Sequence, residues 1–307
     1  MSIDNQIHLG RDTEATEANW EAIAASMPVA PQLFMGERPR KTNNAKFLYP
    51  RYSGQLRGCC VGEAAAHAIE HLTRLPADKN PNSPPREGMA ISPLATYLQA
   101  RLYSRSRGLN LGGEGAIVSH CAEAISDADG GIVRYDYYPA TTENYKQYSD
   151  NVRLSAKALE DKKTYIVREK ALLTSFDAIL DALASGRTVD VGTPIPSGMM
   201  NTSADGSFRW TGWGLTGRGV GGHSYLLVDY DLDADLMYVD NSWDNAGWGD
   251  VAGCKAGKYP RPLGKVRISE FYATFESRLL TNGTSEAVVF NDAGDWSTPK
   301  LIYDNSW

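Results

Sequence analysis

Two strand-like runs joined by a turn constrain the fold of this 307-residue chain more than any other feature. Apolar and polar side chains alternate within residues 221–231, an Asp-rich turn follows, and residues 236–239 form a second such run. This pattern predicts a β-hairpin. The hairpin would bring His223 and Asn241 together at one end. An imidazole beside a side-chain amide is an oriented general base that needs a nucleophile.

Cys60 is the strongest candidate for that nucleophile. It lies where a glycine-containing loop enters an alanine-rich stretch with strong helix propensity. A thiol in the first turn of a helix has a lowered pKa, and the backbone N–H groups there can bind an oxyanion. Gln55, five residues earlier, adds a second donor. The alternative is that Cys59 and Cys60 simply pack in the core, because free cysteines are often buried.

Composition sets limits on the class of protein. Hydrophobic residues make up 42% of the chain and charged residues 22%, which is typical of a globular protein with one or two substantial cores. The net charge of -6 gives no reason to expect a nucleic acid or an anionic membrane as partner. No stretch of about 18 apolar residues and no secretory signal is evident. We therefore expect a cytoplasmic protein.

The four cysteines are sparse and include no C-x-x-C pair, so neither a zinc site nor a disulfide framework is indicated. We expect no metal and no cofactor. Cys121 stands within a predicted helix among Ala and Ile and is interpreted as a core residue. Reduced thiols fit a reducing compartment.

Hydrophobic periodicity predicts the remaining elements. Helices are predicted at residues 14–27, 93–105, 116–125 and 175–184, besides the one that starts near Cys60. Strands are predicted at residues 165–167, 188–193, 266–268, 271–275 and 278–280. Asp190 interrupts an apolar strand, and nothing in the sequence explains it.

The order of these elements predicts an α+β protein with two lobes. Residues 1–50 are interpreted as an N-terminal arm, with a short inhibitory leader as the alternative. Residues 51–160 would form a helical lobe that carries the nucleophile, and residues 161–282 a strand-rich lobe that carries His223 and Asn241. Residues 283–307 are expected to be a C-terminal tail.

Two glycine-rich loops are candidates for a position beside a cleft. Gly112 and Gly113 belong to a loop that lacks the spacing of a phosphate-binding motif, and we interpret them as substrate-binding residues. Residues 198–219 contain six glycines and two tryptophans. They predict a long mobile loop with exposed aromatic surface, unless the tryptophans hold the loop against the protein.

Taken together, these residues resemble the papain-like cysteine peptidases, over residues 50 to 280 or so. Gly58-Cys59-Cys60 and the helix after it are similar to the family's nucleophile segment. Gly222-His223 before an apolar strand is similar to its histidine segment. Asn241-Ser242-Trp243 with Trp248-Gly249 resembles its Asn-Ser-Trp, Trp-Gly signature. The match is to a bacterial or phage-type member without a large prodomain.

The resemblance implies a role for each matching residue. Cys60 would be the nucleophile, His223 its proton partner, Asn241 the amide that orients the imidazole, and Gln55 an oxyanion donor. Trp243 would shield the hydrogen bond between His223 and Asn241.

The resemblance also implies a fold and an activity. The fold would have a helical lobe and a barrel-like, strand-rich lobe with the active site in the cleft between them, where Gly222 and Trp243 would also contact substrate. The protein would cleave protein or peptide substrates through an acyl-enzyme, in the cytoplasm or in association with a virion. The alternatives are another thiol amidase or acyl-transfer enzyme, such as a cell-wall peptide hydrolase, and a catalytically inactive binding protein. The sequence does not indicate an oligomeric state.

Overall fold

The computed structural model describes most of the chain between residues 11 and 292. The described residues are 11–29, 37–50, 55, 58–76, 82–109, 111, 113–127, 130–141, 143–144, 154–203, 205–213, 219–243, 263–272, 275 and 285–292.

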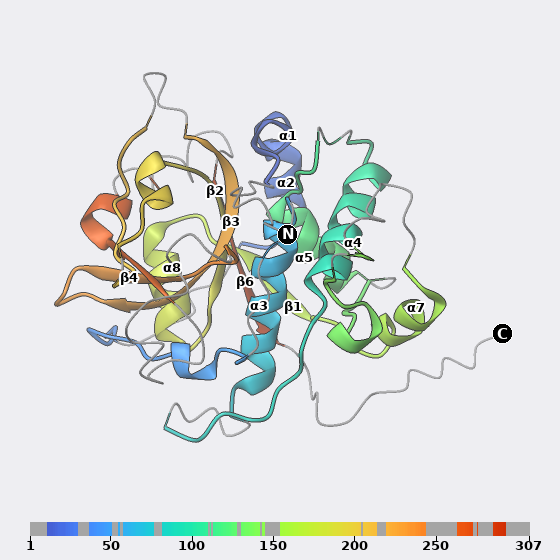
Figure 1. Ribbon diagram of the computed structural model, residues 1–307, viewed down its shortest axis with the longest axis horizontal. Helices are drawn as coiled ribbons and strands as arrows, with labels where there is room; N and C mark the ends of the chain where they lie inside the picture. The colour runs from blue at the N-terminus through green and yellow to red at the C-terminus, as the bar shows by residue number, and fades with distance from the viewer. Residues whose placement is uncertain are drawn as a thin grey trace.

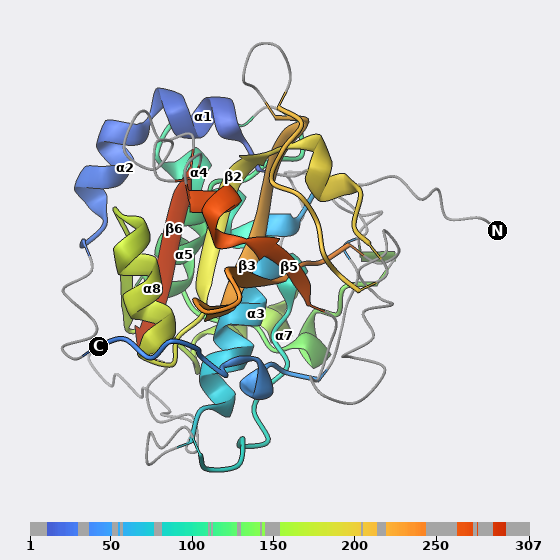
Figure 2. The same cartoon turned by 90° about the vertical axis from the view of Figure 1, so that its left-hand side faces the viewer.

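A six-stranded sheet in which all paired strands are antiparallel runs through the described structure (Figure 1, Figure 2). In sheet order its strands are β1 (Glu169–Leu172), β6 (Glu286–Asp292), β2 (Val189–Ile195), β3 (Gly221–Asp231), β4 (Leu236–Asp240) and β5 (Gly264–Arg267). β3 and β4 are the predicted hairpin, and Asp235 in their turn has a φ of 55°. The hairpin prediction is therefore confirmed.

Helices lie on both sides of the sheet. They are α1 (Thr13–Ala18), α2 (Trp20–Ser26), α3 (Cys60–Arg74), α4 (Pro93–Ser106), α5 (Val118–Ser126), α7 (Ala156–Lys162) and α8 (Phe176–Ala184), with 3-10 turns η1 (Ala45–Phe47), η2 (Tyr135–Tyr137) and η3 (Ser197–Met200). In Figure 1, α3, α4 and α5 lie on one side of the sheet and α8 lies on the other.

The sheet separates two hydrophobic cores. Leu226 of β3 faces the core built around α3, α4 and α5, whereas its neighbours Tyr225 and Leu227 face the core built around α8. This alternation follows from the two-residue period of a strand. Each face of β3 is therefore buried against a different lobe, as the predicted two-lobed α+β arrangement requires.

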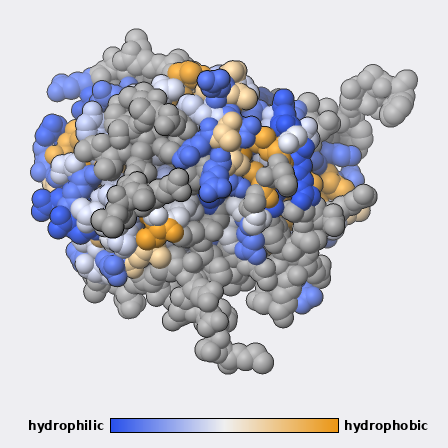
Figure 3. Space-filling view, turned by 90° about the horizontal axis from the view of Figure 1, so that it is seen from above, coloured by the Kyte–Doolittle hydropathy of each residue, from blue (hydrophilic) through white to orange (hydrophobic). Residues whose placement is uncertain are grey.

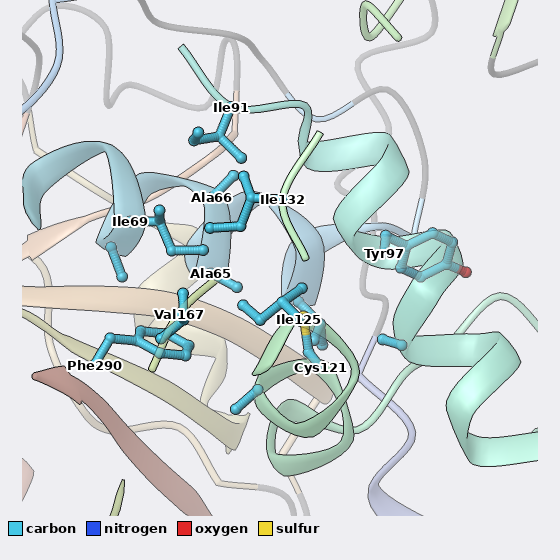
Figure 4. Close-up of a cluster of buried hydrophobic side chains, with 14 of the residues drawn as sticks. Ala65, Ala66, Ile69, Ile91, Tyr97, Cys121, Ile125, Ile132, Val167 and Phe290 are labelled. Atoms are coloured by element: carbon cyan, nitrogen blue, oxygen red, sulfur yellow. The ribbon is translucent and has the colours of Figure 1, made fainter. Parts of the chain in front are cut away.

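The small residues of α3 let it lie deep between its neighbours. A Cβ atom added at Gly62 would collide with the carbonyl of Pro93 and the Cβ atom of Tyr97, so a glycine is needed where α3 and α4 cross. Figure 4 shows Ala65 of α3 and Cys121 of α5 in one buried cluster, and Cys121 is fully buried, which confirms its predicted core position.

Most predicted helices are observed, with one split. The helix expected over residues 14–27 is divided into α1 and α2 at Asn19, whose side-chain amide donates to the Ala15 carbonyl at 2.8 Å. α4 begins as predicted at Pro93, because the Ser92 hydroxyl accepts from the Ala95 N–H and proline has no N–H to satisfy at that position.

Several strand predictions are wrong. Residues 165–168 are not in a strand, and β1 begins at Glu169 instead. Residues 268–272 are helical, so the strand expected from Phe271 is also wrong; the Phe271 side chain packs against Trp210, and tertiary packing overrides its strand propensity. The strand expected at residues 278–280 lies outside the described residues.

Residues 286–292, expected to lie in a tail, form β6 between β1 and β2. Pairing between strands so distant in sequence has no local signal.

The tryptophan loop also differs from its main prediction, because Trp210 is buried and packs edge-on against Trp213 and Phe271. The alternative, that the tryptophans hold the loop in place, is the one observed.

The described surface is mostly hydrophilic when viewed from above, with small separate apolar patches (Figure 3). Among the described residues, no helix is both long and apolar enough to cross a membrane.

Candidate active site

Cys60 is the first residue of α3, and Cys59 is its N-cap. The Cys60 thiol is fully buried and its Sγ atom accepts a hydrogen bond from the backbone N–H of Ser224 at 3.3 Å. The Cys59 Sγ instead lies 3.9 Å from Glu63 Oε1, on the same helix. The Cys60 thiol therefore contacts the strand that carries His223.

His223 and Asn241 meet as the hairpin predicts. His223 lies near the start of β3 and Asn241 follows the end of β4, and His223 Nε2 is 2.7 Å from Asn241 Oδ1. An amide oxygen only accepts, so Nε2 carries the hydrogen in this pair. The other nitrogen, Nδ1, has no hydrogen-bond partner among the described residues and is left as a proton acceptor. The Ser242 N–H also donates to Asn241 Oδ1, at 2.9 Å, and fixes the amide in place.

Trp243 covers this hydrogen bond. Its ring stacks on the imidazole of His223 with a centroid distance of 4.5 Å and an angle of 30° between the planes. Both side chains are buried. The contact between His223 and Asn241 is therefore shielded from solvent, as the family resemblance implies for Trp243.

Burial controls the protonation of His223. Desolvation lowers the pKa of His223 from 6.5 to about 4, and the hydrogen bond to Asn241 opposes this shift. Without a thiolate beside it, the His223 imidazole is therefore uncharged at neutral pH. A neutral imidazole with an open Nδ1 is the form that can take a proton from a thiol.

Gln55 lies beside the same segment. Its backbone N–H donates to the Ser242 carbonyl at 2.7 Å, and its Oε1 atom accepts from the Ser242 hydroxyl at 2.9 Å. Because the amide oxygen is held by Ser242, the orientation of the side chain is fixed and its NH2 end is set as the donor. The predicted oxyanion donor is thus tied to the residue that follows Asn241.

The predicted substrate-binding glycines are only partly described. Gly112 lies outside the described residues, as do Trp248 and Gly249. Gly113 is exposed with a φ of 54°, and the next residue, Glu114, accepts from the Gly58 N–H at 3.2 Å. Glu114, the residue after Gly113, therefore contacts the segment that leads to Cys60.

Two functional contacts were missed by sequence reasoning. Ser224 joins the Cys60 thiol to β3, and its hydroxyl donates to Asp190 Oδ1 of β2 at 2.8 Å. Burial raises the pKa of Asp190 well above its ordinary value, although the bond from Ser224 opposes this. The position of Asp190 in an apolar strand was the available signal, but its partner is distant in the sequence.

The described residues include no group of three or more His, Cys, Asp or Glu side chains that could hold a metal ion. Cys59, Cys60 and Cys121 are buried thiols outside any disulfide. The chemistry that this arrangement supports is that of a thiol, an imidazole and an amide.

Comparison with known proteins finds similarity at the level of structure. No family model and no curated protein sequence matches the chain. Xylellain, a cysteine protease from Xylella fastidiosa, aligns with a TM-score of 0.58 and 16% identity over 87% of this chain and 92% of that one. A procathepsin B from Trypanosoma congolense aligns with a TM-score of 0.56 and 12% identity over 88% and 84% of the two chains.

The bromelain protease from Ananas comosus, solved with the E64 inhibitor, aligns with a TM-score of 0.51 and 14% identity over 81% of this chain and 97% of that one. Each of these structures is a cysteine protease. The protein therefore has the papain-like fold, with a mixed helical and antiparallel-sheet architecture.

Proposed function

We propose that the protein is a cysteine peptidase that hydrolyses peptide bonds through a covalent acyl-enzyme. One observation carries the proposal: His223 is held by Asn241 through Nε2 and keeps Nδ1 open, while the next residue in the strand, Ser224, contacts the Cys60 sulfur. Nucleophile, base and orienting group are thus contributed by α3, β3 and the end of β4. The papain-like fold supports the same function.

The reaction begins with transfer of the Cys60 thiol proton to His223 Nδ1. The thiolate attacks the carbonyl carbon of a peptide bond, and the carbonyl oxygen becomes an oxyanion. The Cys60 backbone N–H and the Gln55 NH2 group would stabilise this charge, and each such donor contributes about 3 kcal/mol to lowering the barrier. His223 then protonates the leaving amine. Water, activated by the neutral imidazole, finally hydrolyses the thioester and restores the thiol.

The buried setting of His223 favours this cycle. Desolvation alone keeps the His223 imidazole neutral. The imidazolium therefore forms only together with the Cys60 thiolate, which is stabilised by the N-terminus of α3. The place of action would be a reducing compartment such as the cytoplasm, with which the free thiols of Cys59, Cys60 and Cys121 agree, or a virion. The substrate would be a protein or peptide.

Turnover of casein and of a panel of peptide-aminomethylcoumarin substrates under reducing conditions tests the proposal. We expect activity in the wild-type protein and in Cys59→Ala, and loss of nearly all turnover in Cys60→Ala. Cys59→Ala is the matched control because it removes the neighbouring thiol without touching the contact with Ser224. Hydrolysis of purified cell-wall peptides but not of casein would favour the amidase alternative. Activity that survives in Cys60→Ala would refute the thiol mechanism.

A further inference from the structure

Residues Arg11 and Asp12 of the N-terminal arm lie between the two segments that flank the candidate site. The Arg11 N–H donates to the carbonyl of Gly222, directly before His223, at 3.2 Å. On the other side the Asp12 N–H donates to the carbonyl of Ala116 at 3.0 Å, and Arg11 and Ala116 form a parallel bridge. The arm is thus held through its backbone, as an extended peptide is held in a binding site.

The Arg11 side chain is buried against β2, next to the position of Ser224, the residue after His223. Gly192 of β2 pairs with Ser224 of β3, the residue after His223. A Cβ atom added at Gly192 would lie 2.6 Å from Arg11 Nε, so the arginine occupies the space that a side chain at position 192 would need. Arg11 is only 5% exposed. Its side chain therefore lies over Gly192 and Ser224, on the face of the β2–β3 pair that is turned toward α5.

Glu286 receives the guanidinium. Arg11 Nη2 lies 3.2 Å from Glu286 Oε2, and both side chains are fully buried. The N–H groups of Val118 and Ser119 at the start of α5 also donate to the Glu286 carboxylate, at 3.3 and 3.1 Å, and the Ser119 hydroxyl donates at 2.6 Å. These donors hold the carboxylate in one orientation.

Asp190 does not take the place of Glu286 as the partner of the Arg11 guanidinium. Its burial favours the neutral acid, and its Oδ1 is bound by Ser224. Glu286 is the carboxylate that the Arg11 guanidinium contacts. A buried carboxylate that loses a cationic partner is left with an uncompensated charge, so a neutral side chain is a poor replacement for arginine at this position.

Resting on the proposed function, we infer that Glu286 selects substrates with an arginine or lysine side chain and that Arg11 occupies this substrate position as an internal ligand. The backbone hydrogen bonds of residues 11 and 12 hold the arm where a peptide would lie beside His223. The ion pair supplies the side-chain specificity. Arg11 must leave before a substrate enters.

A binding experiment tests this without relying on turnover. Fluorescein-labelled alanine hexapeptides carry one arginine, moved through all six positions, and each is matched by a peptide with citrulline, which has the same shape but no charge. Binding is measured by fluorescence anisotropy to Cys60→Ala and to Cys60→Ala with Arg11→Ala. We expect one arginine position to bind about tenfold or more tightly than its citrulline match. Arg11→Ala should tighten binding of that peptide, because it removes the internal competitor.

Adding Glu286→Gln should abolish the difference between arginine and citrulline, because glutamine keeps the size and the acceptor for α5 but not the charge. If this variant does not fold, as judged by near-UV circular dichroism, the comparison of arginine with citrulline in the protein that keeps Glu286 still decides the matter. Equal binding of arginine and citrulline at every position would overturn the inference. Equal binding by the proteins with and without the Arg11→Ala change would also overturn it.

The same peptides separate this inference from the proposed function. Incubation with protein that retains Cys60, followed by mass spectrometry, reports cleavage. Cleavage without an arginine preference would refute the role of Glu286 and leave the peptidase proposal standing. An arginine preference in binding with no cleavage of any peptide would refute the peptidase proposal instead.

Discussion

His67 Nδ1 lies 3.1 Å from Asp240 Oδ2, which joins α3 to β4 directly behind the candidate site. Asp240 precedes Asn241, and His67 Nε2 also lies 3.7 Å from Glu63, whose other oxygen contacts the Cys59 sulfur. All of these side chains are buried. The helix that carries Cys60 and the strand that leads to Asn241 are thus linked by an imidazole between two carboxylates.

Replacing His67 by leucine should strongly destabilise the protein. The change removes the imidazole and leaves the carboxylates of Glu63 and Asp240 buried beside an apolar side chain, for which we expect a loss of roughly 3 kcal/mol or more in the free energy of unfolding. Urea unfolding measures this loss. His120→Gln is the control, because His120 is also buried but its Nδ1 atom pairs with the neutral Ser104 hydroxyl, at 2.8 Å. Its loss should be near 1 kcal/mol. Equal effects of the two changes would contradict the prediction.

The lowered pKa of His223 predicts a loss of stability in mild acid. In the unfolded chain the imidazole takes a proton near pH 6.5, whereas in the folded protein it does so only near pH 4. Between these values the unfolded state binds more protons, so stability falls as the pH is lowered from about 7 to 4. The shift from 6.5 to about 4 corresponds to roughly 3 kcal/mol.

Denaturant unfolding of the wild type and His223→Gln at several pH values between 4 and 7 isolates this effect, since all other groups are shared. The wild type should lose more stability than the variant over this range. Parallel curves would show that His223 is not the group responsible.

Asn241→Ala should lower kcat by about a hundredfold while leaving the Cys60 thiol in place. Asn241 Oδ1 accepts from Nε2 of His223 and so fixes the nitrogen that faces the thiol. Loss of a correctly positioned general base typically costs about 10² to 10⁴ in rate. Steady-state kinetics with a cleaved peptide, together with counting of the reactive thiol by iodoacetamide labelling, separates lost orientation from lost folding. Unchanged kcat would remove Asn241 from the mechanism.

The local elements were largely predictable, whereas contacts between distant segments were not. Ser92 and Pro93 mark the start of α4 through capping chemistry, and the alternation in β3 predicts the hairpin, because both signals lie within a few residues. The placement of β6 between β1 and β2 depends on pairing across the chain. The same limit applies to the site. His223 and Asn241 share a hairpin, but the contact of Ser224 with Cys60 spans 164 residues.

Asp190 provides the last prediction, because its place in an apolar strand is explained by its hydrogen bond with Ser224. Burial raises its pKa, so above pH 4 or so the folded protein keeps a proton that the unfolded chain has released. Its contribution to stability therefore decreases as the pH rises.

Asp190→Asn keeps the acceptor for Ser224 and removes the titrating group. We expect the variant to be more stable than the wild type at pH 7, and close to it at pH 3. Asp190→Ala, the control, removes the acceptor and should destabilise the protein at both pH values. Lower stability of Asp190→Asn at pH 7 would contradict the prediction and show that Asp190 is needed as a carboxylate.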